Sequence, residues 1–268
     1  MSVTGRLEGK RAIVCGAGQA PGSTIGNGKA IAILFARAGA AVACVDRDAE
    51  RLAETVAAIE AEGGKAVAIV ADITKPEDAR RIVDEAKAAL GGVDILINNV
   101  GIGGGGDGPP DTLTEAAFDR IMSVNLKGAW LVTKAVMPEM KAGGGGSIVN
   151  ISSLASIAGG FQMAYEVSKA AMNRMTRSVA LSGAAKQIRC NVITPGLMDT
   201  PMAIGGISRA TGQPEDALRK DRAARVPMKR MGNGWDTAHA ALFLASDEAN
   251  FISGVVLPVD GAQGARVG

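Results

Sequence analysis

The chain is poor in the residues that build metal sites, disulfide frameworks and aromatic pockets. Its 268 residues include one histidine, three cysteines, one tyrosine, two tryptophans and five phenylalanines. A single histidine, His239, argues against a histidine-based metal site or a Ser-His-Asp triad, and we expect it to be structural. The cysteines, Cys15, Cys44 and Cys190, lie apart in apolar runs, which predicts reduced, buried thiols in a cytoplasmic protein without a metal.

Other absences exclude further classes of protein. No apolar run approaches the roughly 18 residues that a membrane span needs, and the opening MSVTGRLEGK lacks the apolar core of a signal peptide. The 29 basic and 27 acidic residues leave a net charge of only +2. So small an imbalance gives no footprint for nucleic acid or an anionic membrane, and we expect neither as a partner.

What the chain has is an alternation of short apolar runs with longer helical segments. The predicted strands are Arg11–Cys15, Ala41–Val45, Ala66–Val70, Val93–Ile97, Ser147–Ile151, Ile188–Ile193 and Val255–Val259. The predicted helices are Lys29–Ala38, Ala49–Glu62, Pro76–Leu90, Thr114–Met140, Met163–Gly183 and Trp235–Ala245, with a short one around Pro214–Arg222. Strands that are apolar on both faces indicate an α/β fold: a single doubly wound Rossmann-type domain, 1–268, with about seven parallel strands and helices on both faces. Two small α/β domains are the alternative, but no linker divides the chain.

A glycine-rich loop between the first strand and the first helix predicts a nucleotide site. Glycines there let the backbone turn sharply and approach a pyrophosphate, whose charge lies at the helix N-terminus. The loop is longer than the usual fingerprint, so side chains of the insertion could also contact the pyrophosphate. The candidate residues are Gly16, Gly18, Ser23, Thr24, Gly26 and Gly28.

The second predicted strand ends at Asp46, which bears on the choice of cofactor. A carboxylate there can accept hydrogen bonds from both ribose hydroxyls and repels a 2′-phosphate. The adjacent Arg47 could tolerate a phosphate, but the pattern favours NAD over NADP.

The sole tyrosine, Tyr165, precedes Lys169 by four residues, which places both side chains on one helical face. A nearby ammonium is expected to lower the pKa of the phenol, so that it can exchange a proton with an alcohol or carbonyl oxygen. Ser152 and Ser153 end the fifth strand, at the sheet edge where ligands bind. Asn125 interrupts a long helix, where asparagine is a poor helix former and marks a kink or a bound water.

Together these motifs resemble the short-chain dehydrogenase/reductase family over nearly the whole chain. The matching features include the glycine-rich loop, Asp72, Asn98-Asn99-Val100-Gly101, Asn125, Ser152-Ser153, Tyr165 with Lys169, and Pro195-Gly196. The resemblance implies a catalytic tetrad of Asn125, Ser153, Tyr165 and Lys169, in which Tyr165 is the general acid/base, Lys169 also binds the nicotinamide ribose and Asn125 holds a relay water. It further implies cofactor contacts from Asp72, Ile73, Asn99, Gly101, Tyr165, Lys169, Pro195, Gly196 and Thr200.

Two features of the resemblance leave a choice open. The family usually places its serine thirteen residues before the tyrosine, often as the second of a pair. Spacing favours Ser152 here, whereas position within the pair favours Ser153, and we select Ser153 because a loop absorbs a deletion more easily than a strand shifts register. The segment 197–233 fits a substrate lid, and Gly103–Gly106 fits a flexible rim.

The expected function is NAD-dependent interconversion of a secondary alcohol and a ketone, a small-molecule substrate, by hydride transfer. One alternative is an NADPH-dependent 3-oxoacyl thioester reductase; another, of a different class, is a non-catalytic dinucleotide-binding sensor or scaffold. The resemblance also implies a homo-oligomer, a dimer or homotetramer, built from the helical segments 114–140 and 163–183.

Overall fold

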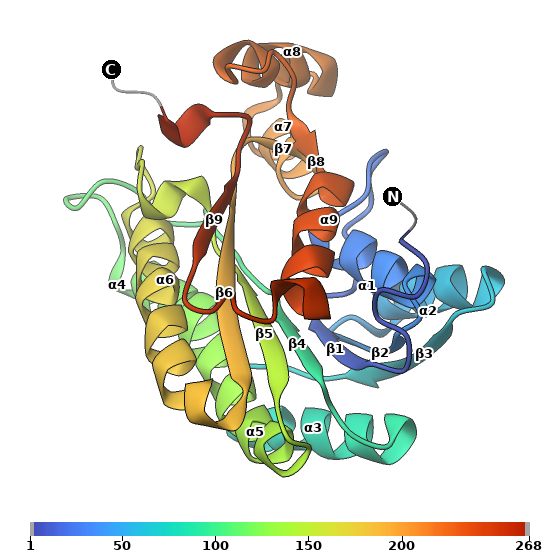
Figure 1. Ribbon diagram of the computed structural model, residues 1–268. Helices are drawn as coiled ribbons and strands as arrows, with labels where there is room; N and C mark the ends of the chain where they lie inside the picture. Colours follow the sequence, from blue (N-terminus) through green and yellow to red (C-terminus); the bar gives the residue numbers. More distant parts are fainter. Residues whose placement is uncertain (1–2, 266–268) are drawn as a thin grey trace.

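The computed structural model describes residues 3–265 and contains one seven-stranded parallel sheet. The strand order is β3-β2-β1-β4-β5-β6-β9, which is a doubly wound arrangement (Figure 1). The strands are β1 Arg11–Cys15, β2 Ala41–Asp46, β3 Lys65–Val70, β4 Ile95–Asn98, β5 Gly146–Ile151, β6 Ile188–Pro195 and β9 Val256–Val259. The predicted α/β class and all seven predicted strands are therefore confirmed, with bounds that differ by up to two residues.

The sheet is buried on both faces because its strands carry apolar side chains on both. In β1, Ala12 and Val14 join one apolar cluster, whereas Ile13 and Cys15 join another on the opposite face. Successive side chains of a strand point to opposite sides of the sheet, so one continuous apolar run supplies both clusters.

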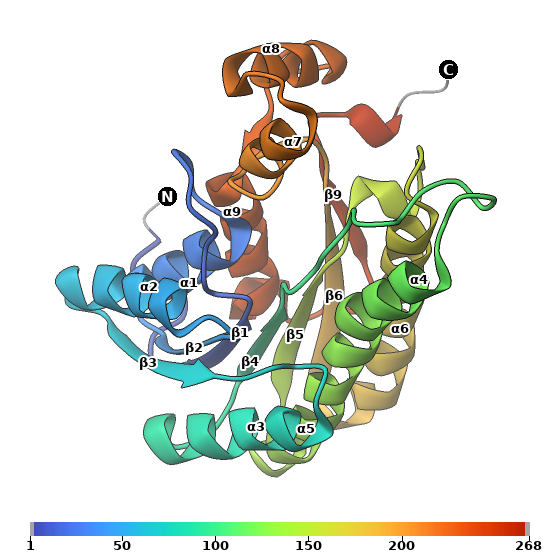
Figure 2. The same ribbon diagram turned by 180° about the vertical axis from the view of Figure 1, so that it is seen from behind.

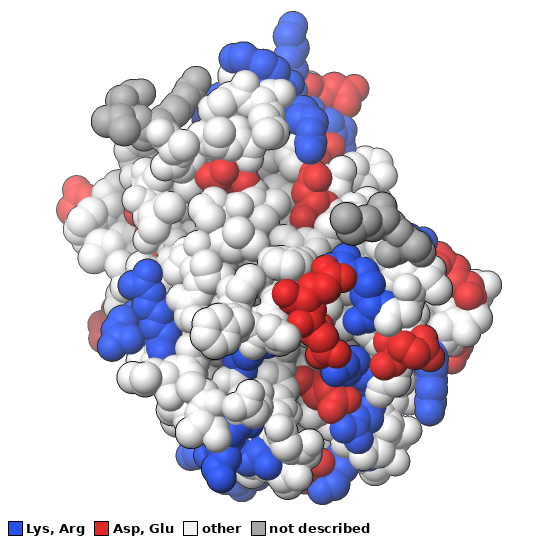
Figure 3. Space-filling model, in the orientation of Figure 1, with Lys and Arg blue, Asp and Glu red and all other residues white. Residues whose placement is uncertain are grey.

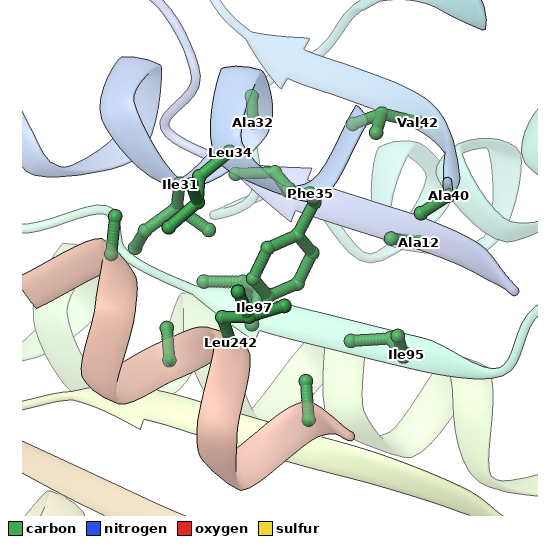
Figure 4. Close-up of a cluster of buried hydrophobic side chains, with 14 of the residues drawn as sticks. Ala12, Ile31, Ala32, Leu34, Phe35, Ala40, Val42, Ile95, Ile97 and Leu242 are labelled. Atoms are coloured by element: carbon green, nitrogen blue, oxygen red, sulfur yellow. The ribbon is translucent and has the colours of Figure 1, made fainter. Parts of the chain in front are cut away.

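Two layers of helices cover these faces. Helices α1 Asn27–Arg37, α2 Ala49–Ala61 and α9 Gly234–Ala245 pack on one face, and α3 Pro76–Leu90, α5 Ala129–Ala142 and α6 Met163–Gly183 pack on the other (Figure 2). In the first layer Phe35 of α1 and Leu242 of α9 meet Ile97 of β4 (Figure 4). None of the helices within residues 3–265 combines the length and the apolar character of a membrane-spanning segment.

The predicted long helix Thr114–Met140 is helical along this length from Glu115 onward but not α-helical throughout. It is divided into α4 Glu115–Met122, a π-helical turn over Ser123–Gly128, and α5, which runs on to Ala142. Asn125 lies in this turn, so the irregularity that its presence predicted is confirmed. Short π-helical turns inside α-helices are frequent at functional sites.

The segment after β6 extends above the carboxyl ends of the strands (Figure 1). It forms β7 Met198–Asp199, α7 Ile204–Thr211, α8 Glu215–Arg225 and β8 Gly232–Asn233, with β7 and β8 paired in a small parallel sheet. Helix α8 corresponds to the predicted short helix, whereas α7 was not predicted. We call the segment 197–233 the lid.

Candidate functional site

The candidate catalytic side chains meet at the carboxyl edge of the sheet. Ser153 follows β5, and Tyr165 and Lys169 lie in the first two turns of α6. The Ser153 hydroxyl hydrogen-bonds to the phenol of Tyr165. The Lys169 ammonium lies 5.7 Å from the centre of the Tyr165 ring and donates to the carbonyl of Ile151 at 2.9 Å. The four-residue spacing thus brings phenol and ammonium together, and the end of β5 adds the Ser153 hydroxyl to the same cluster.

The charges of this cluster differ from the expectation. Burial raises the pKa of the Tyr165 phenol, and the hydrogen bond from Ser153 only partly opposes that effect. Burial also lowers the pKa of Lys169 to about 8. The expected lowering of the phenol pKa by Lys169 is therefore wrong for this structure, because both groups are desolvated and desolvation favours the neutral form of each.

The two adjacent serines have different partners. Ser152 is buried and its hydroxyl donates to the main-chain carbonyl of Lys169 at 2.9 Å. Ser153 is half-buried, hydrogen-bonds to Tyr165 and accepts from the N–H of Ala155 at 3.1 Å. Only Ser153 of the pair presents its hydroxyl to the phenol.

Asn125 is fully buried and holds the chain that follows β4. Its amide oxygen accepts from the N–H of Ile102 at 2.8 Å, and its Nδ2 donates to the carbonyl of Ile102 at 2.9 Å. Nδ2 also donates to Ser168 Oγ at 3.0 Å, and Ser168 donates to the carbonyl of Tyr165 at 2.7 Å. The π-helical turn is thereby connected to the first turn of α6.

The glycine-rich loop is folded tightly against the ends of β1 and β4. Gly16 has a φ of 80°, in the left-handed region, and its carbonyl accepts from Nδ2 of Asn99 at 3.0 Å. Gly28 packs so closely on that carbonyl that a Cβ at position 28 would overlap it. Gly26 immediately precedes α1, as expected for a loop that ends at a helix N-terminus.

The inserted part of this loop is directed toward the lid. Ser23 Oγ accepts from Arg219 of α8 at 3.0 Å, and Gly22 packs against Pro201. Gln19 closes the insertion by donating to the carbonyl of Thr24 at 3.1 Å and accepting from the N–H of Gly26 at 2.7 Å. In this structure Ser23 and Thr24 therefore form a bridge to the lid and a turn.

Asp46 lies at the carboxyl end of β2, beside the loop. Its Oδ2 accepts from the N–H of Gly18 at 3.0 Å, and its Oδ1 accepts from the N–H of Asp48 at 3.2 Å. Asp72 and the buried Ile73 follow the neighbouring strand β3, where Asp72 Oδ1 accepts from the N–H of Thr74 at 3.0 Å. These residues form one continuous edge.

The remaining predicted residues line the other half of the edge. Gly101 lies next to Lys169, whose Nζ would be 3.0 Å from a Cβ at position 101. Pro195 ends β6, and Gly196 packs against Asp260. Thr200 is buried where the lid begins, and its hydroxyl accepts from the N–H of Ala203 at 3.3 Å.

The residues present fit a dinucleotide along this edge. A carboxylate at the end of β2 and exposed loop backbone at the N-terminus of α1 are the groups that such a ligand requires. The amide oxygen of Asn27, at the start of α1, is buried and has no partner within residues 3–265. Asn27 is not among the residues predicted from the sequence, although it lies between Gly26 and Gly28 of the predicted loop.

Other sites find no support in the described chain. Across residues 3–265 no three His, Cys, Asp or Glu side chains gather in a group that could hold a metal ion. Cys15, Cys44 and Cys190 are buried free thiols, as predicted, and burial raises the pKa of each to about 12.

Comparison with known proteins gives relatives over almost the full chain. Residues 22–262 match the family model described as enoyl-(acyl carrier protein) reductase. The chain is 39% identical over 256 residues to an uncharacterized oxidoreductase of Thermotoga maritima, covering 95% of this chain and 97% of that protein. It is 38% identical over 244 residues to the 2-(R)-hydroxypropyl-CoM dehydrogenase of Xanthobacter autotrophicus (90% and 95%), and 38% identical over 257 residues to the 7alpha-hydroxysteroid dehydrogenase of Escherichia coli (96% and 94%).

Solved structures agree with this grouping. A crystal structure described as a short-chain dehydrogenase/reductase from Burkholderia xenovorans superposes with a TM-score of 0.93 at 44% identity, covering 99% of this chain and 100% of that chain. Levodione reductase superposes with a TM-score of 0.91 at 30% identity (97% and 100%). With the glycine-rich loop, Asp46 and the Ser153–Tyr165–Lys169 cluster in place, the chain belongs to the short-chain dehydrogenase/reductase family of NAD(P)-dependent oxidoreductases.

Proposed function

We propose that the protein interconverts a secondary alcohol and a ketone with NAD as its cofactor. The observation that carries the proposal is the cluster of Tyr165, Ser153 and Lys169 at the carboxyl edge of the sheet. Two relatives are named as dehydrogenases of a hydroxypropyl compound and of a hydroxysteroid, both secondary alcohols. A substrate of that class is the corresponding proposal for this chain.

In the alcohol-oxidising direction, the phenolate of Tyr165, which burial disfavours in this structure, takes the proton of the substrate hydroxyl. Ser153 orients the substrate oxygen through a hydrogen bond. One of the three N–H donors of Lys169 is hydrogen-bonded to the carbonyl of Ile151, so two remain that could bind the ribose of the cofactor and face the Tyr165 phenol. The bound nicotinamide supplies the hydride acceptor, or the hydride donor in the reverse direction. Asn125 keeps Ile102 in place beside this cluster, and its proposed role in a water relay rests on the family resemblance.

The general acid/base role is tested by Tyr165→Phe, which keeps the ring and removes only the hydroxyl. We expect turnover of a secondary alcohol with NAD to fall by about 10² to 10⁴, with NAD affinity within about twofold of wild type. Because Tyr165 is the only tyrosine, no second phenol can substitute. Turnover close to that of wild type in Tyr165→Phe would refute the mechanism.

The preference for NAD over NADP rests on Asp46. Its carboxylate faces the loop through Gly18, where a ribose 2′-phosphate would be repelled. We expect calorimetric titrations to give tighter binding of NAD than of NADP. Asp46→Ala should reduce the difference between the two affinities by weakening the binding of NAD. Asp48→Ala is the matched control, since it removes a carboxylate that caps α2 two residues away. Equal affinities in the wild type would contradict the preference.

The alternatives predict different results in the same assays. A 3-oxoacyl thioester reductase of the proposed NADPH type requires tight NADP binding beside Asp46, and a non-catalytic sensor requires binding without turnover. A panel of secondary alcohols, ketones and 3-oxoacyl thioesters, measured with both cofactors, separates these cases. The cytoplasmic location remains a prediction from the reduced thiols.

Self-association is proposed through the outer faces of α4, α5 and α6. An open, largely apolar groove runs between them, and its lining includes none of Ser153, Tyr165 or Lys169. It is lined by Asp119, Met122, Ser123, Leu126, Lys127, Trp130, Ala171 and Met175. Trp130 is 43% exposed in this groove. A second copy of the chain would cover apolar surface there, consistent with a dimer that can double into a tetramer.

A further inference from the structure

The first turn of α6 carries Tyr165 and is only partly capped by its own residues: Glu166 accepts from the N–H of Gln162 at 3.1 Å, but it does not hold the N–H groups of Met163, Ala164 and Tyr165. The residue before the helix, Gln162, makes no capping hydrogen bond with its side chain. The first N–H groups of any helix lack partners inside it and must find them elsewhere. Tyr165, the third residue of α6, owns one of these N–H groups.

A segment more than fifty residues upstream supplies the missing partners. The N–H of Met163 donates to the carbonyl of Gly108 at 3.2 Å. The N–H of Ala164 donates to Oδ1 of Asp107 at 2.9 Å, and the N–H of Tyr165 donates to Oδ2 of the same carboxylate at 3.1 Å. Both oxygens of Asp107 are thus engaged with the start of α6, where a negative charge is also favoured by the helix dipole.

Asp107 and Gly108 form one end of a short strap, residues 101–108, whose other end is also fixed. Asn125 holds Ile102 through its main-chain N–H and carbonyl. Between these anchors, Gly104, Gly105 and Gly106 have φ values of 70°, 55° and 91°, which side chains rarely adopt. The strap therefore follows a path fixed at both ends by groups of the catalytic region.

The strap passes directly beside the phenol. A Cβ at Gly103 would lie 3.5 Å from Cδ2 of the Tyr165 ring. A shift of the first turn of α6 would therefore move the ring relative to both Ser153 and the strap. Lys169 lies one turn further into the helix and is held separately through Ile151.

We propose that Asp107 is a positioning residue for the reaction: by holding the N–H groups of Ala164 and Tyr165, it sets the phenol against Ser153 and fixes the rim of the substrate cleft. This role rests on the proposed function, in which Tyr165 is the general acid/base. It requires Asp107 to affect turnover through Tyr165. Cofactor binding should change little, because Asp46, the glycine-rich loop and Asp72, which are proposed to hold the cofactor, lie on other elements.

The test compares Asp107→Ala with wild type on the secondary alcohol turned over fastest in a panel assay with NAD. We expect kcat to fall by about tenfold or more, because small displacements of a catalytic group are costly, and the calorimetric Kd for NAD to stay within about twofold. Asp107→Asn, which keeps one acceptor oxygen, should recover part of the loss. Should Asp107→Ala not fold, a wild-type kcat in Asp107→Asn overturns the proposal.

Thr114→Ala is the matched control. Thr114 caps α4 by accepting from the N–H of Ala117 at 3.2 Å, and its loss removes a similar cap from a helix without Tyr165. The bond from the main-chain N–H of Thr114 to the carbonyl of Gly106 in the strap, 3.1 Å long, does not involve the side chain and is kept in alanine. We expect both variants to melt at lower temperature but only Asp107→Ala to lose turnover. Equal losses of kcat in the two variants would make Asp107 a structural cap only.

A double variant separates this proposal from the proposed function. In the Tyr165→Phe background, Asp107→Ala should cause no further loss of turnover, since the two residues act through one hydroxyl. Full activity in Tyr165→Phe alone refutes the proposed function itself. An inactive Tyr165→Phe beside a fully active Asp107→Ala refutes only the positioning role. The ring signals of the sole tyrosine, followed by NMR with labelled tyrosine in the NAD complex, should shift in Asp107→Ala and stay unchanged in Thr114→Ala.

Discussion

Lys169 shows how a single residue can trade stability for function. Its side chain is only 3% exposed, and burial lowers its pKa to about 8, against about 10.4 for an exposed lysine. At a pH between these two pKa values, Lys169 is protonated in the unfolded chain but mostly neutral in the folded chain. The free energy of unfolding therefore rises with pH between about pH 8 and about pH 10.4. Below about pH 8 the full cost of burying the ammonium is present.

Lys169→Met should therefore stabilise the cofactor-free protein while abolishing turnover. At pH 7 we expect the free energy of unfolding to rise by about 1–3 kcal/mol, since methionine fills a similar volume without a charge, and the advantage to shrink as the pH approaches 10. Urea denaturation at both pH values measures this. Lys141→Met, at an exposed lysine of α5, is the control and should change neither the free energy of unfolding nor turnover. A variant less stable than wild type at pH 7 would contradict the argument.

Among the structural elements, the loop between β1 and α1 contains two glycines with different roles. Gly28 is needed for tight packing of the loop, and Gly26 is needed for the approach of a ligand. A Cβ at position 28 would overlap the carbonyl of Gly16, whereas a Cβ at position 26 would meet only the side chain of Gln19, at 3.6 Å from Oε1 and 3.8 Å from Cγ. Gly28 therefore allows the loop to pack against itself, and Gly26 leaves room that the proposed pyrophosphate would use.

Gly28→Ala and Gly26→Ala should accordingly fail in different ways. We expect Gly28→Ala to lower the free energy of unfolding by about 1–3 kcal/mol, the usual cost of overpacking. Gly26→Ala should cost no more than about 1 kcal/mol of stability, as for a weaker helix cap, yet raise the Kd for NAD by about tenfold or more through crowding of the pyrophosphate. Thermal denaturation and calorimetry measure the two effects; unchanged NAD affinity in Gly26→Ala would contradict the loop assignment.

At the same level, the elements that the sequence predicts are those fixed by local pattern. The strands follow from runs that are apolar on both faces, and α6 follows from its helical spacing. Helix α7 was missed because Gly205 and Gly206 lower its helix propensity. The cap that Asp107 gives to α6 was missed because it joins segments 57 and 58 residues apart, which no local pattern encodes.

Over the whole molecule, apolar surface is distributed unevenly. The centre of the face in Figure 3, over β6 and β9, carries few charged side chains, and β9 is an edge strand of the sheet. Leu181 at 82% and Phe251 at 100% are exposed. Edge strands and large exposed apolar side chains are the surfaces that a further copy of the chain would cover.

The oligomer proposed through α4, α5 and α6 is tested by Trp130→Glu. A carboxylate in the groove would have to lose its hydration on association, which is costly. Lys134, whose ammonium lies 5.3 Å from the centre of the Trp130 ring, would offset only part of that cost. We expect wild type to show the mass of a dimer or tetramer by light scattering, and Trp130→Glu to show a smaller one. Val70→Glu is the control, because Val70 is 45% exposed on β3, at the opposite edge of the sheet, and should leave the mass unchanged. A monomeric wild type would exclude self-association, and an unchanged mass in Trp130→Glu would place it on another surface. If Trp130→Glu forms a smaller species that still binds NAD, the nucleotide edge of each subunit is complete without its neighbour.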